Sequence, residues 1–318
     1  MRIVFMGTSE FAVPILKAIL QSRHDVVGVV TQPDKPAGRG RRVRVSPVKH
    51  VAEEAGVSVY QPEKVRDREF IRLIEEIAPD AIVVAAYGQI IPPEILEIPK
   101  FGCINVHASL LPKYRGAAPV HYALFNGESR TGVTTMMMDP GLDTGPILLQ
   151  REVDIHPEDN ESSLEQRIAE VGAQLLLETL DGLEAGSVVP VPQDNSKATY
   201  APTVKREECM VNWEENADKI VNRIRGCTPR PGAFALWRGS FLKIWQAFAL
   251  PEEANVKSPG EVLRVDKRGI FVQSGKGAVC LVEVQPENRT RMHAADFARG
   301  YGIGPGSRLN WLDSSHRK

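Results

Sequence analysis

The feature that most constrains the fold is the alternation of short apolar runs with amphipathic segments over the first 155 residues. Continuous Val/Ile runs are typical of strands buried on both faces, and intervening helices let consecutive strands run parallel. The pattern predicts an α/β fold with a doubly wound, mostly parallel sheet. The expected strands are residues 2–7, 25–31, 57–60, 80–88, 102–108, 132–139 and 147–155, and the expected helices are residues 11–21, 47–55 and 68–77.

The chain changes character after residue 186. Residues 186–208 are polar and rich in proline, which is typical of a linker between domains. Beyond a short expected helix at 217–225, strand-like runs follow one another at hairpin spacing with glycine-containing turns, which predicts a small antiparallel, OB-like β-barrel. We therefore expect a first domain over 1–188, a linker over 189–207 and a C-terminal β-barrel domain over 208–318.

Charge is distributed unevenly along the chain. Residues 1–205 carry 21 basic and 27 acidic side chains, whereas residues 206–318 carry 18 and 13, a net charge of +5. This surplus indicates that the C-terminal third meets something anionic. The four cysteines are scattered, so we expect free thiols and no metal site. No apolar run reaches the ~18 residues of a membrane span, so we expect a cytoplasmic protein.

Gly7 ends the first expected strand, where a dinucleotide-binding fold would begin its glycine fingerprint. Ser9 and Ala12 replace the second and third glycines of that fingerprint. The phosphate-cradling turn is therefore not encoded, which disfavours a nicotinamide cofactor.

Polar side chains interrupt the apolar strand at residues 102–108. Asn105 and His107 share one face near its end, and the tight Gly/Pro-rich loop after the next strand carries Asp139 and Asp143. A carboxylate beside an imidazole fixes the tautomer and orientation of the ring, and an amide can donate to a developing oxyanion. The combination suits acyl transfer without a Ser or Cys nucleophile. The residues alone leave a purely structural histidine equally open.

A basic stretch lies between the second expected strand and the next helix. Residues 35–49 contain six basic side chains and no acidic one: Lys35, Arg39, Arg41, Arg42, Arg44 and Lys49. Pro36, Gly38 and Gly40 are expected to preclude regular structure over its first half. Such a run is often only a solvated loop, but Arg-rich segments commonly become ordered on RNA. Together with the positive C-terminal third, it predicts an extended anionic ligand.

Four motifs together identify a family. "INVHASLLPKYRGAAPV", "DPGLDTGPIL", "TQPDKPAGRG" and "AYGQIIP" resemble the methionyl-tRNA formyltransferases, a branch of the 10-formyltetrahydrofolate-dependent formyltransferase family. The resemblance begins at "VFMGTSEFA" and covers essentially the whole chain. It implies a Rossmann-like formyltransferase core followed by the barrel. The strand motif with SLLP fixes the cofactor class, whereas the basic loop and the second domain indicate tRNA as the acceptor.

The resemblance also implies roles for individual residues. Asn105 would donate to the formyl oxygen, His107 would help move a proton off the α-amino group of methionine, and Asp143 would hold His107. The tetrahydrofolate site would be lined by Ser109, Leu110, Leu111 and Pro112. Initiator Met-tRNA would be contacted by Lys35, Arg39, Arg41, Arg42 and Arg44, and the barrel would hold its backbone. The resemblance requires no metal, and we expect a monomer.

Two alternative functions keep the same catalytic core, and a third does without it. A formyltransferase for glycinamide ribonucleotide would lack residues 206–318, and one for a sugar nucleotide would have no evident use for the Arg-rich loop. A non-catalytic RNA-binding protein would not need Asn105, His107 and Asp143 together.

Overall fold

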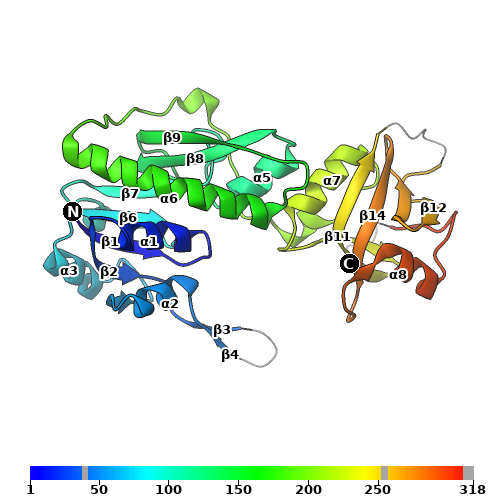
Figure 1. Cartoon of the computed structure of the whole chain (residues 1–318), viewed down its shortest axis with the longest axis horizontal. Helices are drawn as coiled ribbons and strands as arrows, with labels where there is room; N and C mark the ends of the chain where they lie inside the picture. The colour runs from blue at the N-terminus through cyan, green and yellow to red at the C-terminus, as the bar shows by residue number, and fades with distance from the viewer. Residues whose placement is uncertain (38–41, 252–256, 311–318) are drawn as a thin grey trace. The chain divides into compact units, whose positions relative to one another are not determined.

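The computed structural model describes residues 1–37, 42–251 and 257–310, without the side chains of 35–44. The predicted contacts of Arg39 and Arg41 therefore lie outside the described residues. The chain divides into two compact units (Figure 1). Unit 1 comprises Met1–Pro119, Arg130–Asp154 and Glu165–Ala201, and unit 2 comprises Val120–Ser129, Ile155–Leu164 and Pro202–Lys318.

Unit 1 is built on a seven-stranded sheet in the order β5-β2-β1-β6-β7-β8-β9. The strands are β1 Arg2–Gly7, β2 Asp25–Val30, β5 Val59–Tyr60, β6 Ala81–Ala85, β7 Cys103–His107, β8 Arg130–Met137 and β9 Ile147–Asp154. The first five strands in this order, β5, β2, β1, β6 and β7, pair in parallel. Strand β8 is antiparallel to β7, and β9 is antiparallel to β8. The predicted mostly parallel α/β sheet is confirmed.

Helices cover both faces of this sheet, as a doubly wound fold requires. They are α1 Ala12–Leu20, α2 Pro47–Glu54, α3 Arg68–Ile77, α4 Pro93–Leu96 and α6 Glu161–Ala185. On one face, Cys103 of β7 packs in a buried core with Phe70 of α3 and Ile95 of α4. On the opposite face α6 lies along the sheet (Figure 1), and Gly172 of α6 approaches Val106 of β7.

Gly7 has a packing role in unit 1. A Cβ atom on Gly7 would lie 2.7 Å from the Phe5 ring and 2.8 Å from Ala12 Cβ. The glycine therefore lets α1 start directly against β1, which explains its place at the strand end without a bound dinucleotide.

The basic stretch is more regular than expected. Lys35–Ala37 and Arg42–Arg44 form a two-stranded antiparallel ribbon, β3 and β4, in which Pro36 pairs with Val43. The expectation that Pro36 precludes regular structure was wrong. Both strands are edge strands, and a proline is tolerated on an edge strand where its nitrogen faces away from the partner.

Unit 2 contains an antiparallel sheet in the order β10-β11-β14-β13-β12, with β15 paired to β14. The strands are β10 Ala233–Trp237, β11 Ser240–Leu250, β12 Val262–Asp266, β13 Gly269–Gln273, β14 Ala278–Pro286 and β15 Met292–His293. Its helices are α5 Pro119–Phe125, α7 Ala217–Gly226 and α8 Ala294–Tyr301, with short 3-10 turns at Asn195–Lys197 in unit 1 and Arg206–Cys209 in unit 2.

A returning segment closes the sheet of unit 2 into a barrel. Leu309 N donates to Gly260 O at 2.8 Å, next to β12. Asn310 and Leu236 of β10 exchange two backbone hydrogen bonds of 2.9 Å. The segment thereby joins the two outer strands, and the predicted antiparallel C-terminal barrel is confirmed.

Residues 189–201, which the sequence assigns to the linker, run back along unit 1. Val191 and Ile147 exchange two backbone hydrogen bonds of 2.8 Å. Thr199 O accepts from Arg115 N at 2.8 Å, and Ala201 N donates to Arg115 O at 2.7 Å. These isolated bridges involve backbone groups alone, so they leave no periodic pattern in the sequence.

Among the described residues, no helix combines the length and apolar character needed to cross a membrane.

Candidate active site

Strand β7 carries the first two candidate residues. Asn105 and His107 are two residues apart, so they face the same side of the sheet as Cys103, beneath α3 and α4. Asn105 is partly buried and His107 is buried. The covering core therefore gives way to polar groups toward the carboxyl end of β7.

The loop between β8 and β9 brings in the third residue by a route that the sequence did not predict. Because β8 is antiparallel to β7, its last residue, Met137, lies opposite Ile104 near the start of β7. The loop after β8 therefore starts beside the amino end of β7 and not beside its carboxyl end. This loop must fold back over the sheet face to bring Asp143 to Asn105. The fold-back is tight, since a Cβ atom on Gly145 would collide with Met137 O.

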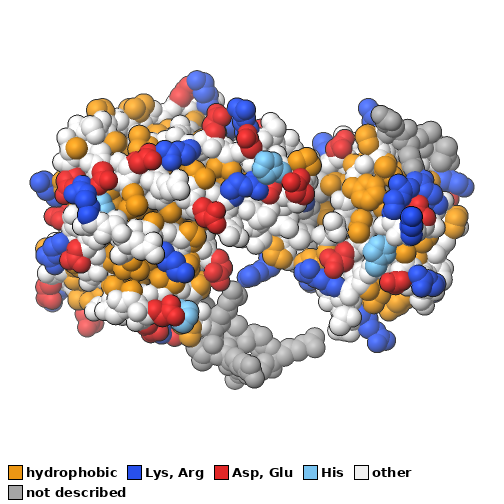
Figure 2. Space-filling model, in the orientation of Figure 1, with side chains coloured by type: hydrophobic (Ala, Val, Ile, Leu, Met, Phe, Trp, Pro, Cys, Tyr) orange, Lys and Arg blue, Asp and Glu red, His pale blue; other side chains and the backbone are white. Residues whose placement is uncertain are grey.

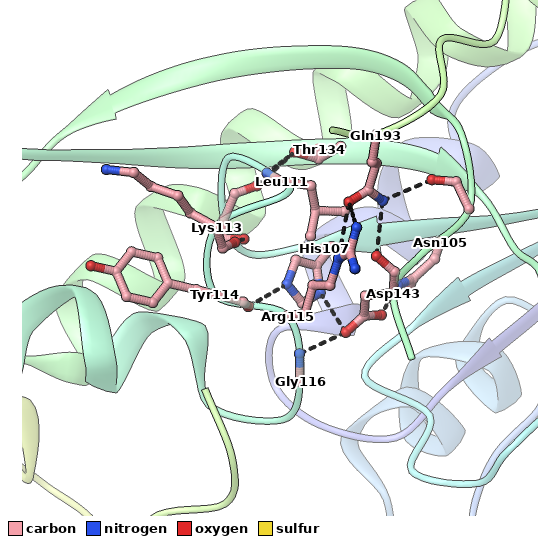
Figure 3. A network of polar contacts seen from close by, with 12 residues as sticks. Asn105, His107, Leu111, Lys113, Tyr114, Arg115, Gly116, Thr134, Asp143 and Gln193 are labelled. Carbon is pink, nitrogen blue, oxygen red and sulfur yellow. Dashed lines mark hydrogen bonds and ion pairs between the residues drawn. The ribbon is translucent and has the colours of Figure 1, made fainter. Parts of the chain in front are cut away.

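Asp143 brings the three candidate residues together (Figure 3). Its Oδ1 accepts a long hydrogen bond of 3.5 Å from Asn105 Nδ2, and its Oδ2 lies 3.7 Å from His107 Nδ1. Oδ2 also accepts from Gly116 N at 2.7 Å. The carboxylate thus contacts both the amide and the imidazole while a backbone N–H fixes its position.

The hydrogen bonds of His107 define its tautomer. Nε2 lies 3.0 Å from Tyr114 O, which can only accept, so Nε2 carries a hydrogen. In the neutral ring, Nδ1 is then the acceptor, and it faces the Asp143 carboxylate. Two acceptors facing each other repel, whereas a proton on Nδ1 is attracted by the carboxylate. The carboxylate therefore lies beside the ring nitrogen that Tyr114 does not bind.

The loop after β7 depends on a glycine. Gly116 has φ +117°, and a Cβ atom there would lie 2.8 Å from Ala201 O. Glycine is required on both grounds, because side chains disfavour this backbone region and no space is available. The same residue supplies the N–H that holds Asp143.

The residues that the resemblance assigns to folate, Ser109, Leu110, Leu111 and Pro112, form the start of this loop. Ser109 is fully buried, and its hydroxyl donates to Lys113 O at 2.6 Å. Leu111 N donates to Thr134 Oγ1 of β8 at 3.1 Å. The first contact closes the loop on itself and the second fastens it to the sheet. Contact of these residues with a folate stays a prediction.

Lys49, the last cation of the basic stretch, is held by contacts next to the ribbon. Lys49 Nζ lies 2.7 Å from Asp34 Oδ2 and 2.8 Å from Gln61 Oε1. The hydrogen bond from Lys49 lowers the pKa of the Asp34 carboxyl, and Asp34 raises the pKa of Lys49. The Lys49 ammonium is therefore already bound by side chains of the protein. Lys35 and Arg44 occupy directly paired positions of β3 and β4.

Sequence reasoning missed a buried polar pair beside the site. Arg115 is 2% exposed, and its guanidinium donates to Gln193 Oε1 at 3.1 and 2.7 Å and to Asn195 Oδ1 at 2.8 Å. The available signal was the arginine inside "PKYRG", because a buried cation needs acceptors from elsewhere in the chain. Nothing in the sequence pattern indicates that the acceptors come from residues 193 and 195.

One group of potential metal ligands occurs among the described residues, but it is already neutralised. His24, Asp181 and Glu184 place their ligand atoms within 4.8 Å of one another. Arg23 pairs with both carboxylates, at 2.7 and 2.5 Å. Burial lowers the pKa of His24, in the direction that disfavours its charged form. We interpret this group as an ion-pair cluster.

Comparison with known proteins identifies the family. The model described as "Formyl transferase" matches residues 1–180, and "Formyl transferase, C-terminal domain" matches residues 203–302. The methionyl-tRNA formyltransferase of Geotalea uraniireducens (strain Rf4) is 49% identical over 98% of this chain and 99% of its own length. That of Pelotomaculum thermopropionicum is 48% identical over 94% and 96%. The chain belongs to the methionyl-tRNA formyltransferase family.

Solved structures share the fold at lower identity. WlaRD, a sugar 3N-formyl transferase, is 21% identical with a TM-score of 0.64 over 91% of this chain and 99% of its own. HypX from Aquifex aeolicus, in complex with tetrahydrofolic acid, is 20% identical with a TM-score of 0.63 over 98% and 50%. The fold is therefore common to formyltransferases with different acceptors.

Proposed function

We propose that the protein transfers the formyl group of 10-formyltetrahydrofolate to the α-amino group of methionine on initiator Met-tRNA. The observation that carries the proposal is the convergence of Asn105, His107 and Asp143 in a chain that is 49% identical to a named methionyl-tRNA formyltransferase over almost its full length. The crystal structures of HypX with tetrahydrofolic acid and of WlaRD with 5-N-formyl-THF support a folate donor for this fold.

The polar groups of the site fit a formyl donor. The Asn105 amide has two hydrogens, and its interaction in the described structure is one long bond to Asp143. A second hydrogen therefore remains for a carbonyl oxygen. Apolar side chains in the loops after β6 and β8 also remain exposed, Ile90 by 89% and Leu142 by 61%, and could cover flat rings.

The chemistry of each residue follows from its partners. When bound, the folate supplies a formyl group on nitrogen, an amide-like carbon that an amine can attack. Asn105 Nδ2 then donates to the formyl oxygen as that oxygen gains negative charge. His107 Nδ1 receives the proton that the attacking α-amino group loses and releases it toward the departing nitrogen, while Asp143 stabilises the protonated ring. The C–N bond to methionine forms first, and the bond to the folate nitrogen breaks as that nitrogen takes up the proton.

We assign tRNA binding to the two basic regions. The ribbon carries Lys35, Arg42 and Arg44, and the intervening residues carry Arg39 and Arg41. The two strands pair Lys35 with Arg44, and a run of closely spaced basic residues attracts a polyanion. Lys and Arg side chains are also visible on the face of unit 2 in Figure 2, consistent with the +5 charge of residues 206–318. We place this activity in a cytoplasmic monomer.

The test is acceptor competition. The purified chain is given 10-formyltetrahydrofolate with initiator Met-tRNA, glycinamide ribonucleotide or a 4-amino-sugar nucleotide, and formylated product is measured for each. Formylation of Met-tRNA alone is the expected result. Preferential formylation of a sugar nucleotide would move the protein to the branch that shares only its fold.

A further inference from the structure

Residues 191–201 connect the two loops that form the site. Val191 pairs with Ile147, at the end of the loop that carries Asp143. Thr199 and Ala201 hydrogen-bond to the main chain of Arg115, in the loop after His107. This bridging segment lies in unit 1, outside the formyltransferase match that ends at residue 180. Its side chains are therefore in position to set the distance between the loops.

Gln193 is the side chain of this segment that contacts both loops (Figure 3). Its Oε1 accepts from Arg115 Nε and Nη2, at 3.1 and 2.7 Å. Its Nε2 donates to Asp143 O at 2.8 Å and to Gly145 O at 2.7 Å. Arginine can only donate and the two carbonyls can only accept, so the orientation of this amide is unambiguous. All its hydrogen-bonding capacity is used.

These contacts form a closed ring around Asp143. Gln193 holds the main chain of Asp143, and Gly116 N holds its carboxylate. Both restraints start from consecutive residues, because Arg115 binds Gln193 and the next residue, Gly116, binds the carboxylate. Asp143 has φ +52°, a left-handed conformation that a non-glycine residue keeps only when its surroundings fix it. The ring supplies that fixation.

We propose that Gln193 is a positioning residue for formyl transfer, which keeps the Asp143 carboxylate against Asn105 and His107. The inference rests on the proposed function. Gln193 does not touch the reacting atoms: it acts through the loop whose carbonyls it binds. Displacing a catalytic group by about 1 Å can reduce turnover about 10²-fold, so a loss of about 10- to 10²-fold in kcat is expected without this amide.

Two substitutions remove the clamp in different ways. Gln193→Glu keeps an acceptor for Arg115 but has no N–H for the carbonyls of Asp143 and Gly145, and it places oxygen against oxygen. Gln193→Met keeps the length of the side chain and removes all its polar contacts. Asn195→Ala is the matched control, because Asn195 accepts from the same arginine at 2.8 Å and makes no described contact with the Asp143 loop.

Kinetics and structure test the proposal separately. Both Gln193 variants should lower kcat for Met-tRNA formylation by about 10- to 10²-fold, while their KM values for the folate donor and for Met-tRNA stay within about threefold of wild type. The kcat of Asn195→Ala should also stay within about threefold of wild type. In an Asp143→Asn background, Gln193→Glu should add little further loss. Unchanged kcat in the Gln193 variants, a loss confined to KM, or losses that multiply with Asp143→Asn would each overturn the proposal.

A crystal structure separates this proposal from the proposed function. In Gln193→Glu, the Asp143 carboxylate should move away from Asn105, whether or not the protein formylates tRNA. An undisplaced carboxylate overturns the positioning role. A wild-type protein without formylation of Met-tRNA refutes the proposed function instead, and leaves the structural result to decide the role of Gln193.

Discussion

Replacing Asp143 by asparagine should reduce formyl transfer strongly while leaving the fold intact. The side-chain oxygen of the asparagine can still accept from Gly116 N, which Asp143 Oδ2 does at 2.7 Å. What disappears is the negative charge 3.7 Å from His107 Nδ1, together with the long hydrogen bond from Asn105 Nδ2, which would face the nitrogen of the new amide. At 3.5 Å the lost bond to Asn105 is weak, so the main change is the loss of the charge that stabilises the protonated ring during proton transfer.

The magnitude follows from the geometry. Opposite unit charges about 4 Å apart attract by about 4 kcal/mol at an effective dielectric constant of about 20. The Asp143 side chain is 15% exposed, so solvent screens part of this attraction. Because each ~1.4 kcal/mol is about tenfold in rate, we expect kcat to fall about 10²- to 10³-fold.

The assay is single-turnover formylation of Met-tRNA at saturating donor, with the melting temperature of the variant as a check on folding. The matched control is Asp139→Asn in the same loop. Asp139 accepts from Gly141 N at 3.0 Å and from the Thr144 hydroxyl at 2.7 Å, contacts that an asparagine oxygen can retain. Activity of Asp143→Asn within about tenfold of wild type, or a loss equal to that of Asp139→Asn, would refute the electrostatic argument.

Three further predictions concern other parts of the chain. Arg39→Ala should raise the KM for tRNA or lower turnover and reduce the salt slope of tRNA binding by about 1, without changing folate binding; weakened folate binding with unchanged tRNA kinetics would contradict the assignment of the basic ribbon. Gly116→Ala should destabilise unit 1 by about 1–3 kcal/mol and reduce activity, because its φ is +117° and its Cβ would meet Ala201 O; urea unfolding measures this, and an unchanged midpoint contradicts it. Burial lowers the pKa of His24 from the ordinary 6.5, so the unfolded chain takes up this proton first as pH falls. The stability that neutral His24 confers is thus complete above about pH 6.5 and declines below it, and His24→Gln should flatten that decline in urea midpoints measured from about pH 7.5 to 5.

The sequence predicted those features that have a local or periodic signature. The apolar runs of β1, β2, β6 and β7 identify the sheet because strands buried on both faces must be apolar. The two-residue strand β5 was predicted longer, since residues 57–58 continue the apolar alternation, whereas the residue pairs with β2 begin at Val59 and Ser58 contributes its carbonyl to Val29 N. Hairpin spacing likewise sufficed for the barrel. Its closure by Leu309 and Asn310 could not be predicted, because single backbone bridges impose no pattern on side chains.

The site shows the same division. Asn105, His107 and Asp143 could be grouped because each residue type suits one role in acyl transfer. The sequence could not predict that the loop carrying Asp143 folds back over the sheet. This depends on the antiparallel direction of β8, which is decided by how the sheet assembles and not by the residues of β8 alone. Gln193 was hidden for a related reason: a partly buried glutamine in a Pro-rich stretch acquires its role only when Arg115 and the Asp143 loop are brought to it.

The most direct test of the shared site is a double-mutant cycle between His107 and Asp143. Single-turnover formylation is measured for His107→Ala, Asp143→Asn and the double variant, with the wild type as reference. If the carboxylate acts through the imidazole, the double variant loses about as much activity as His107→Ala alone. Losses that multiply in the double variant would show that the two groups work independently, and would contradict a mechanism in which Asp143 stabilises the protonated ring of His107.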